Sequence, residues 1–287
     1  MRTTSLIDVL LVLAPLLVVP LGLRLVGPTD GVPRLLLRTA LVIQPFAALA
    51  VVASFLEPVG WTPGLLTAPW LLVGGVAALA GLGRLVRGRP LTLARLVVAA
   101  ALAYLAVGAG WLALSRVGIQ PLGLAPVIVE LTAVHFHYAG FAACLMAALT
   151  IDALENVAPY WRRLALVASL LIVAGSPLVA AGFTLSSRLI QAAGAVVIAS
   201  GVLGLAAVQY GVVARRLRPG KAALLLRLSA ASVVLPMALA VEYSVGRLLG
   251  LPTLDTQTMA LIHGDLNAVG FVGLGLLGWW LNPARRS

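Results

Sequence analysis

Charged side chains are scarce in this sequence, and their scarcity excludes most soluble folds. Only 10% of the 287 residues are Asp, Glu, Lys or Arg, while 61% are hydrophobic. A soluble domain carries roughly 25% charged and 45–50% apolar residues. The apolar excess therefore predicts a chain whose solvent is lipid, because a single water-soluble core cannot bury so many apolar side chains.

Cysteine is nearly absent as well, since Cys144 is the only one. A disulfide within the chain and a zinc or iron–sulfur site built from cysteines are both excluded. The net charge of +11 would suggest nucleic-acid binding in a soluble protein. Here the basic residues stand in short loops between apolar runs, where the positive-inside rule places them. We therefore expect no nucleic-acid partner, and we expect no cofactor.

Long apolar runs dominate what is present, and nine of them are long enough to cross a bilayer. They predict an all-α, polytopic transmembrane helical bundle. The predicted helices are 5–26, 35–56, 65–86, 92–115, 123–151, 164–186, 189–212, 222–249 and 258–281. Helix breakers such as Pro33, Pro63 and Pro159 mark the junctions between runs. The junction near Ser187 is so short that the sixth and seventh helices are predicted to form a hairpin.

The distribution of basic residues predicts the orientation. Of the 20 Lys and Arg residues, 16 lie in the loops after the first, third, fifth and seventh helices or at the C-terminus. These segments are expected inside, which places the N-terminus outside and the C-terminus inside. We expect one integral membrane domain over 1–287, in a bacterial inner membrane. The first run contains Asp8, so we interpret it as a spanning helix and not a signal peptide. No internal repeat is apparent, which weighs against an inverted-repeat transporter.

A few ionisable and polar residues lie inside these runs, where a charge costs at least about 2.5–3.5 kcal/mol. All three histidines of the chain are among them. The predicted catalytic residues are Glu130, His135 and His137 on the fifth helix, Glu242 on the eighth, and His263, Asp265 and Asn267 on the ninth. At 1.5 Å per residue, each lies about 8–20 Å below the outer surface. Three helices thus supply polar groups to the same half of the bilayer, as expected of one site.

Helical phase predicts which of these residues share a face. Glu130 and His137 share one, while His135 points about 140° away from Glu130. His263 and Asn267, four residues apart, share another face, and Asp265 projects from nearly the opposite side. Glu130, His137 and either Asp265 or His263 are therefore expected to line a central cavity.

Aromatic residues near this set are predicted to bind a substrate, because their π faces stabilise a cation. They are Trp111, Phe136, Tyr138, Phe141, Tyr243 and Phe271. Interfacial belts account for Trp61, Trp70, Trp279 and Trp280. Interhelical hydrogen bonding is the alternative role for each polar residue, and it is the role expected of Gln44, Gln191 and Gln209. A metal site is a further alternative, although two histidines at i and i+2 diverge on a helix and chelate poorly.

Two short segments resemble a known family. Val134-His135-Phe136-His137-Tyr138-Ala139-Gly140-Phe141 and His263-Gly264-Asp265-Leu266-Asn267-Ala268-Val269-Gly270-Phe271 are similar to signatures of the YndJ-like family of bacterial integral membrane proteins. The resemblance implies a membrane protein and little about activity. A weaker likeness, in kind only, is to membrane-bound terpene cyclases.

The residues themselves favour an enzyme for a lipophilic small-molecule substrate, and membrane lipid is the other expected partner. The most concrete form is an acid-initiated cyclase or isomerase of a prenyl chain or its epoxide. Such chemistry needs a proton donor in an apolar, water-free pocket. Asp265 or Glu130 is expected to be the acid, with a histidine orienting it and Glu242 accepting a proton. A proton-coupled transporter and a metal-dependent membrane enzyme are the alternatives.

Overall fold

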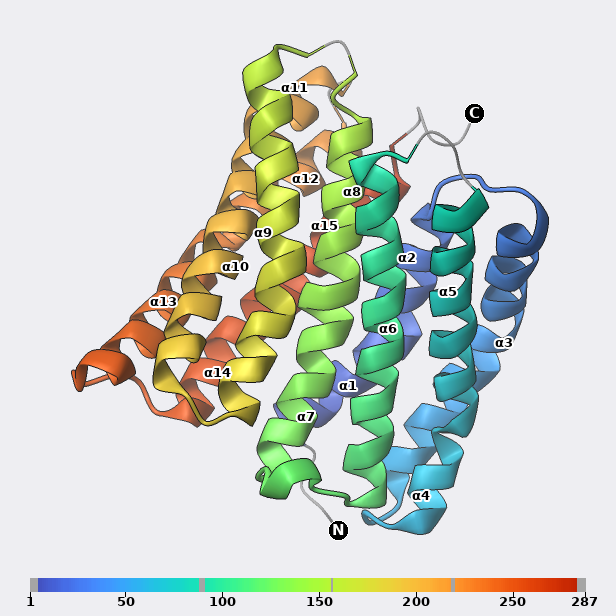
Figure 1. Cartoon of the computed structure of the whole chain (residues 1–287), viewed down its shortest axis with the longest axis vertical. Helices are drawn as coiled ribbons and strands as arrows, with labels where there is room; N and C mark the ends of the chain where they lie inside the picture. The colour runs from blue at the N-terminus through green and yellow to red at the C-terminus, as the bar shows by residue number, and fades with distance from the viewer. Residues whose placement is uncertain (1–4, 88–90, 156, 218–219, 283–287) are drawn as a thin grey trace. The chain divides into compact units, whose positions relative to one another are not determined.

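The computed structural model describes residues 5–87, 91–155, 157–217 and 220–282. Every regular element in these ranges is a helix (Figure 1). Nine helical spans in this part of the chain are long and apolar enough to cross a membrane, which confirms the predicted fold class. They are numbered spans 1 to 9 in chain order: Leu6–Leu25, Gly31–Leu56, Trp61–Val86, Leu93–Val117, Pro126–Asp152, Pro159–Thr184, Arg188–Arg216, Lys221–Leu249 and Leu261–Trp280.

Several spans are made of more than one helical element. Up to residue 143 the elements are α1 (Leu6–Leu13), η1 (Ala14–Val18), α2 (Val19–Leu25), α3 (Gly31–Leu56), α4 (Trp61–Leu66), α5 (Ala68–Arg87), α6 (Leu93–Val117), η2 (Pro121–Gly123), α7 (Pro126–His135) and η3 (Phe136–Ala143). They continue with α8 (Cys144–Asp152), α9 (Pro159–Thr184), α10 (Arg188–Val208), η4 (Gln209–Val213), α11 (Ala214–Arg216), α12 (Lys221–Ser232), α13 (Val234–Leu249), α14 (Thr256–Asp265), η5 (Leu266–Gly273) and α15 (Leu274–Trp280). The chain forms two compact units, Met1–Ala142 and Ala143–Ser287.

Three prolines that were predicted to mark junctions between runs lie in the first turns of the helices that follow those junctions. Pro33 is the third residue of α3, Pro63 the third of α4, and Pro159 the first of α9. The first N–H groups of a helix have no partner within it, so a residue without an N–H costs nothing there. Spans 2, 3 and 6 consequently begin four or five residues before their predicted starts.

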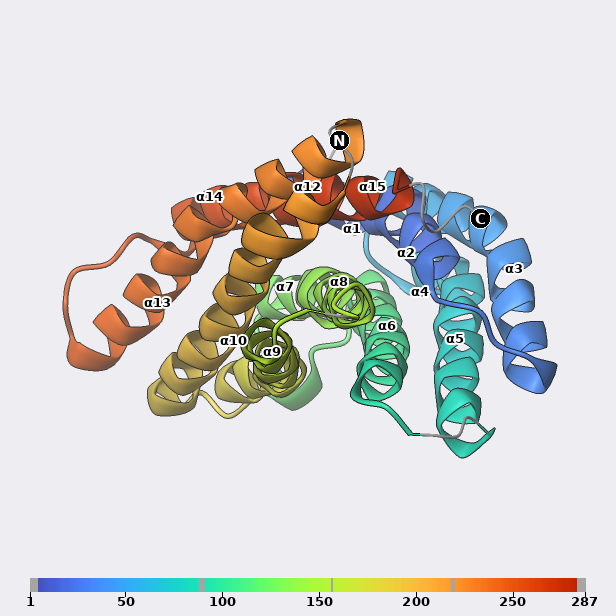
Figure 2. The same ribbon diagram turned by 90° about the horizontal axis from the view of Figure 1, so that it is seen from above.

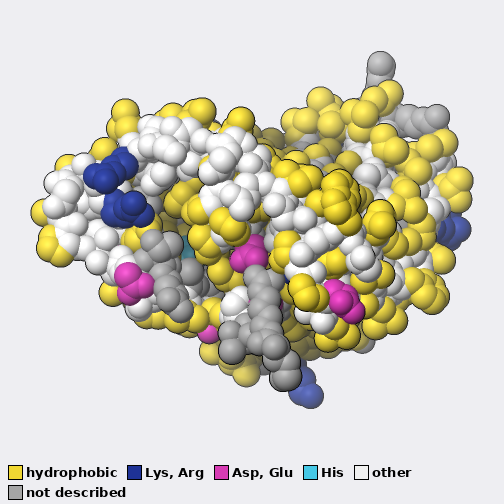
Figure 3. Space-filling model, turned by 90° about the horizontal axis from the view of Figure 1, so that it is seen from below, with side chains coloured by type: hydrophobic (Ala, Val, Ile, Leu, Met, Phe, Trp, Pro, Cys, Tyr) yellow, Lys and Arg dark blue, Asp and Glu magenta, His cyan; other side chains and the backbone are white. Residues whose placement is uncertain are grey.

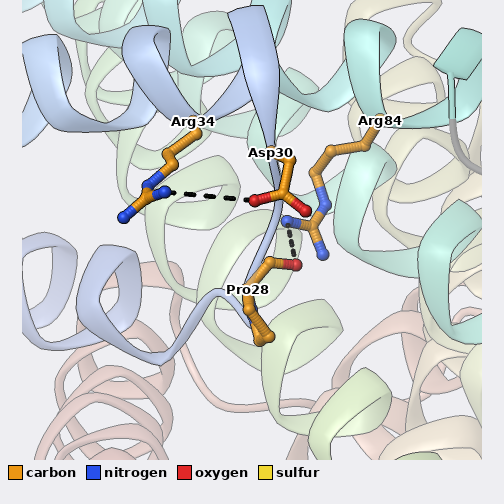
Figure 4. Close-up of polar contacts among 4 residues, drawn as sticks. All are labelled: Pro28, Asp30, Arg34 and Arg84. Carbon is orange, nitrogen blue, oxygen red and sulfur yellow. Dashed lines mark hydrogen bonds and ion pairs between the residues drawn. The ribbon is translucent and has the colours of Figure 1, made fainter.

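In the first unit, α3, α5 and α6 pack side by side in chain order. Glycines on α5 allow the close approach: a Cβ on Gly74 would lie 2.9 Å from the Cα of Ala106, and one on Gly81 would lie 3.2 Å from the Cα of Ala99. Small residues serve helix packing in this way where lipid gives no hydrophobic drive. The turn between spans 1 and 2 is fastened by Arg84, whose Nη1 donates to the Gly27 carbonyl at 2.9 Å. It also donates to the Pro28 carbonyl at 3.4 Å (Figure 4).

Arg116 is one of the four basic residues in segments that were predicted to lie outside, and it is a buried clamp. Its side chain is fully buried near the end of α6. Nη2 donates to the carbonyls of Ser54 at 2.6 Å and Glu57 at 2.8 Å, and the guanidinium lies 4.5 Å from the centre of the Phe55 ring. The last carbonyls of a helix receive no hydrogen bond from a later turn and carry partial negative charge. A cationic donor such as Arg116 therefore stabilises the end of α3.

In the second unit, α9 and α10 form the predicted hairpin (Figure 2). Ser187 caps α10 by accepting a hydrogen bond from the Ile190 N–H. Gly182 lets the helices touch, because a Cβ there would lie 2.6 Å from the Gln191 nitrogen. The three glutamines behave as predicted: Gln191 donates to the Gly182 carbonyl at 3.1 Å, Gln209 to Thr150 at 3.0 Å and Gln44 to the Pro15 carbonyl at 2.6 Å.

Four spans contain a π-helical segment, and η3 and η5 are eight residues long. The π-helix is rare, and where it occurs it often marks a functional site. The wider turn of a π-helix interrupts the regular backbone hydrogen bonds between residues i and i−4. Side chains of neighbouring helices can then donate hydrogen bonds to its carbonyl groups. In η5 the Phe271 carbonyl accepts a hydrogen bond from Ser229 Oγ of α12 at 2.6 Å. On the face seen from below, hydrophobic side chains are plentiful and charged side chains are few (Figure 3).

Candidate functional site

The polar residues predicted to form one site are divided between the two units. Glu130, His135 and His137 belong to Met1–Ala142, whereas Glu242, His263, Asp265 and Asn267 belong to Ala143–Ser287. Their convergence in one cavity stays a prediction, so the geometry of each group is described within its own unit.

His137 of η3 is completely buried and has both ring nitrogens engaged. Nδ1 lies 2.8 Å from the carbonyl oxygen of Ala133. A carbonyl only accepts, so Nδ1 carries the proton, and Nε2 of the neutral ring is an acceptor. Nε2 receives the indole N–H of Trp70 at 3.1 Å. The imidazole is thereby fixed in one tautomer, and it donates to a backbone group and not to a neighbouring carboxyl.

The glycine at position 108 makes room for this imidazole. A Cβ on Gly108 of α6 would lie 2.8 Å from His137 Nδ1. Trp70 is also fully buried, and its ring lies 6.0 Å from that of His137 at an interplanar angle of 23°. The assignment of Trp70 to an interfacial belt was therefore wrong. The same holds for Trp279, which is fully buried, whereas Trp61 is 74% and Trp280 39% exposed.

The aromatic residues around His137 are packed into the first unit. The Phe136 ring contacts Tyr104 at 5.5 Å and His135 at 5.6 Å between ring centres. Tyr138 donates its hydroxyl to the Leu10 carbonyl at 3.0 Å. Phe141 is completely buried, while Glu130, His135 and Trp111 are half-buried. Glu130 precedes His137 by seven residues, which places it about 10 Å farther along the helix.

In the second unit, His263 and Asn267 fasten the turn of span 9 that carries Asp265. His263 Nδ1 lies 2.8 Å from the Pro236 carbonyl of α13, and Asn267 Nδ2 donates to the His263 carbonyl at 2.7 Å. Both side chains are half-buried, while Asp265 is exposed. This confirms the predicted phase, in which Asp265 projects away from the other two. A histidine was predicted to orient the acid by a hydrogen bond, whereas His263 Nδ1 meets a backbone carbonyl.

Glu242 lies farther along α13 than the Pro236 carbonyl that meets His263. Six residues separate them, or about 9 Å along the helix. The Glu242 side chain is exposed, and its Oε1 lies 3.8 Å from where a Cβ on Gly246 would be, one turn nearer the end of α13. Tyr243 is buried; its hydroxyl accepts from Arg247 Nη1, and the guanidinium lies 5.2 Å from its ring centre.

Two further features concern ligands. Within the described residues, no group of three or more His, Cys, Asp or Glu side chains is placed to hold a metal ion. A groove of about 400 Å³ lies between spans 1 and 2. Its lining is Leu16, Leu17, Pro20, Leu21, Arg24, Gln44, Pro45, Ala48 and Leu49. None of the predicted catalytic residues is in that lining.

Nine spans with polar groups inside them define a multi-pass integral membrane protein. More particularly, the chain belongs to the YndJ-like protein family, whose model matches residues 9–271. It is 32% identical over 184 residues to the "Uncharacterized membrane protein YndJ" of Bacillus subtilis (strain 168), an alignment that covers 64% of this chain. The chain spans about a third (32%) of the length of that relative. No solved structure matches.

Sequence reasoning missed Trp70 as a partner of His137 and Pro236 as a partner of His263. A tryptophan near a predicted helix end looks like an interfacial anchor, and a proline carbonyl has no signature in the sequence.

Proposed function

We propose that this protein is a membrane enzyme that transfers a proton to a lipophilic substrate, with Asp265 as the acid. The single observation that carries the proposal is an exposed carboxyl on a fastened turn at membrane depth. Its exposed neighbours are apolar, with Leu261 42%, Ile262 40% and Val269 57% exposed. A charge in such surroundings costs about 2.5–3.5 kcal/mol on insertion scales, and such residues are functional by default.

The roles follow from the contacts. His263 and Asn267 are positioning residues, because their hydrogen bonds hold the backbone on both sides of Asp265. The Asp265 carboxyl gives its proton to an alkene carbon or an epoxide oxygen of a prenyl chain. The resulting cation rearranges and then loses a proton to the carboxylate of Asp265 or Glu242. The product is an isomer of the substrate, so no oxidant, reductant or cofactor takes part.

Deuterium transfer tests this proposal. The wild-type protein in nanodiscs would be incubated in D2O with a linear prenyl alkene and, separately, with its terminal epoxide. We expect an isomeric product carrying solvent deuterium, loss of that product in Asp265→Asn, and full retention in Glu155→Gln, which alters an exposed acid in a loop. Absence of solvent deuterium from both substrates, or equal products from Asp265→Asn and wild type, would refute the role of Asp265.

A second candidate is a proton-coupled transporter. The observation that favours it is the presence of π-helical interruptions in spans 5 and 9, because interrupted helices in corresponding parts of a chain mark the binding sites of many transporters. Liposomes containing the wild-type protein would then acidify when an outward-to-inward substrate gradient is applied. The Asp265→Asn variant would abolish this acidification while Glu155→Gln would preserve it.

A further inference from the structure

Spans 2, 3 and 4 begin at the same spacing along the chain as spans 6, 7 and 8, with an offset of 127 or 128 residues. Span 6 begins at Pro159, 128 residues after Gly31 of span 2, and both are 26 residues long. Span 8 begins at Lys221, 128 residues after Leu93 of span 4. In both sets, consecutive spans pack against one another, and the first span of each set contains an internal proline, Pro45 or Pro177.

Spans 4 and 8 end with the same C-cap. The cap residue is Gly118 in one and Gly250 in the other, with φ of 88° and 72°. Both glycines have the left-handed backbone conformation, which costs free energy for residues with a side chain. Gly118 and Ile119 donate their N–H groups to the Leu114 carbonyl, and Gly250 and Leu251 donate theirs to the Gly246 carbonyl. Each cap follows a basic residue in the last turn, Arg116 or Arg247.

The last span of each set repeats in greater detail. α7 and α14 are both ten residues long and begin 130 residues apart, and each runs into an eight-residue π-helix, η3 or η5. At the same offset, Gly140-Phe141 matches Gly270-Phe271 and His137 matches Asn267. His137 and Asn267 each bond through the side chain to the carbonyl four residues earlier. A Cβ on Gly140 would meet Tyr104 of α6, and one on Gly270 would meet Ser232 of α12.

We infer that spans 2–5 and 6–9 are two copies of one four-helix repeat, with His137 and Asn267 at equivalent positions, and that the position in the second copy binds a lipophilic molecule through a hydroxyl or N–H donor. Each span of the first copy lies four spans before its counterpart in the second copy, an even number, so the counterparts cross the membrane in the same direction. This is a parallel repeat, and it supplies the internal symmetry that was not apparent from the sequence alone.

The difference between the copies identifies the ligand chemistry. In the first copy, His137 Nε2 is the acceptor at the equivalent position, and it accepts a hydrogen bond from the indole N–H of Trp70. In the second copy, His263 Nδ1 donates to the Pro236 carbonyl, so Nε2 of the neutral ring is an acceptor. Asn267 donates its amide N–H to the His263 carbonyl, and its Oδ1 is a second acceptor. Among the described residues neither acceptor has a partner, and both side chains are half-buried. Two acceptors beside apolar helix faces suit a long-chain alcohol or amide.

The ligand site uses His263 and Asn267, which also position Asp265, so it rests in part on the proposed function. The two proposals stay distinguishable in the wild-type protein, because it can prefer the alcohol without transferring a proton to either prenyl substrate, and the reverse. We expect the ligand to donate one or two hydrogen bonds to these acceptors, in surroundings without competing water. These bonds correspond to roughly a three- to twentyfold tighter binding of a ligand with a donor than of the same ligand without one.

One experiment tests the site with two matched probes. Equilibrium binding of radiolabelled hexadecanol and of hexadecyl methyl ether, which lacks the donor, would be measured on the full protein in nanodiscs. We expect the alcohol to bind at least threefold more tightly than the ether, and Asn267→Leu and His263→Phe to remove this preference. Gln191→Leu, which removes an amide from span 7, is the control and should keep it. Equal binding of alcohol and ether, or an unchanged preference in Asn267→Leu, overturns the site.

A second arm tests the repeat and does not depend on the ligand. If positions 137 and 267 are equivalent, Asn at 137 keeps the bond to the Ala133 carbonyl that His137 makes. We expect His137→Asn to retain a melting temperature clearly above that of His137→Leu, which loses that bond. If the two variants melt together, or neither gives folded protein while Gly75→Ala does, the equivalence is refuted.

Discussion

The contact between Trp70 and His137 makes a sharp prediction about stability. Trp70→Phe keeps an aromatic ring in the buried position and deletes the indole N–H, so His137 Nε2 loses the donor that lies 3.1 Å away. A buried acceptor left without a partner costs about 1–3 kcal/mol, and the smaller ring leaves a void that adds about 1 kcal/mol. We expect a loss of roughly 2–4 kcal/mol.

The measurement is the free energy of unfolding of the purified protein in mild detergent, from denaturant titration followed by circular dichroism. Trp61→Phe is the matched control, because Trp61 is 74% exposed, and surface changes usually stay within about 0.5 kcal/mol. The double variant Trp70→Phe/His137→Phe removes both polar partners, so we expect its loss to fall short of the sum of the single losses by at least about 1 kcal/mol. Equal losses for Trp70→Phe and Trp61→Phe, or strict additivity, would refute the reasoning.

Three further predictions use the same unfolding measurement. Arg116→Gln should lower the free energy of unfolding by about 2–4 kcal/mol, because hydrogen bonds from a charged donor contribute about 1.5–3 kcal/mol each. Arg34→Gln, at an exposed position, should leave it unchanged. Equal effects of the two changes would contradict the role of Arg116 as a clamp. Ser229→Ala leaves the Phe271 carbonyl of η5 without its side-chain donor and should cost about 1–2 kcal/mol, whereas Ser200→Ala on an exposed site should not. Gly140→Ala places a Cβ 2.8 Å from the Cβ of Tyr104 and should cost about 1–3 kcal/mol by overpacking. Gly75→Ala, with open space around it, should stabilise or leave stability unchanged, and a reversed order would contradict the packing of η3.

The sequence was sufficient for the spans and for the phase of the polar residues on them. Span length follows from the thickness of the bilayer, and apolar runs record it directly, so the nine predicted helices match the nine spans in the described residues to within about five residues. Phase within one helix is also a local property. His263 and Asn267 share a face, opposite Asp265, because of their spacing alone.

Tertiary structure decided which partner each polar group has. His137 meets Trp70, 67 residues away in the chain, and Arg116 meets Ser54, 62 residues away. Such pairs depend on which helices are neighbours and how each is rotated, and in this sequence most helix faces are apolar, so the pattern of polarity does not specify the rotation. The π-helical turns were likewise outside local reasoning, because their altered backbone bonds persist only where side chains of a neighbouring helix, such as Ser229, satisfy them.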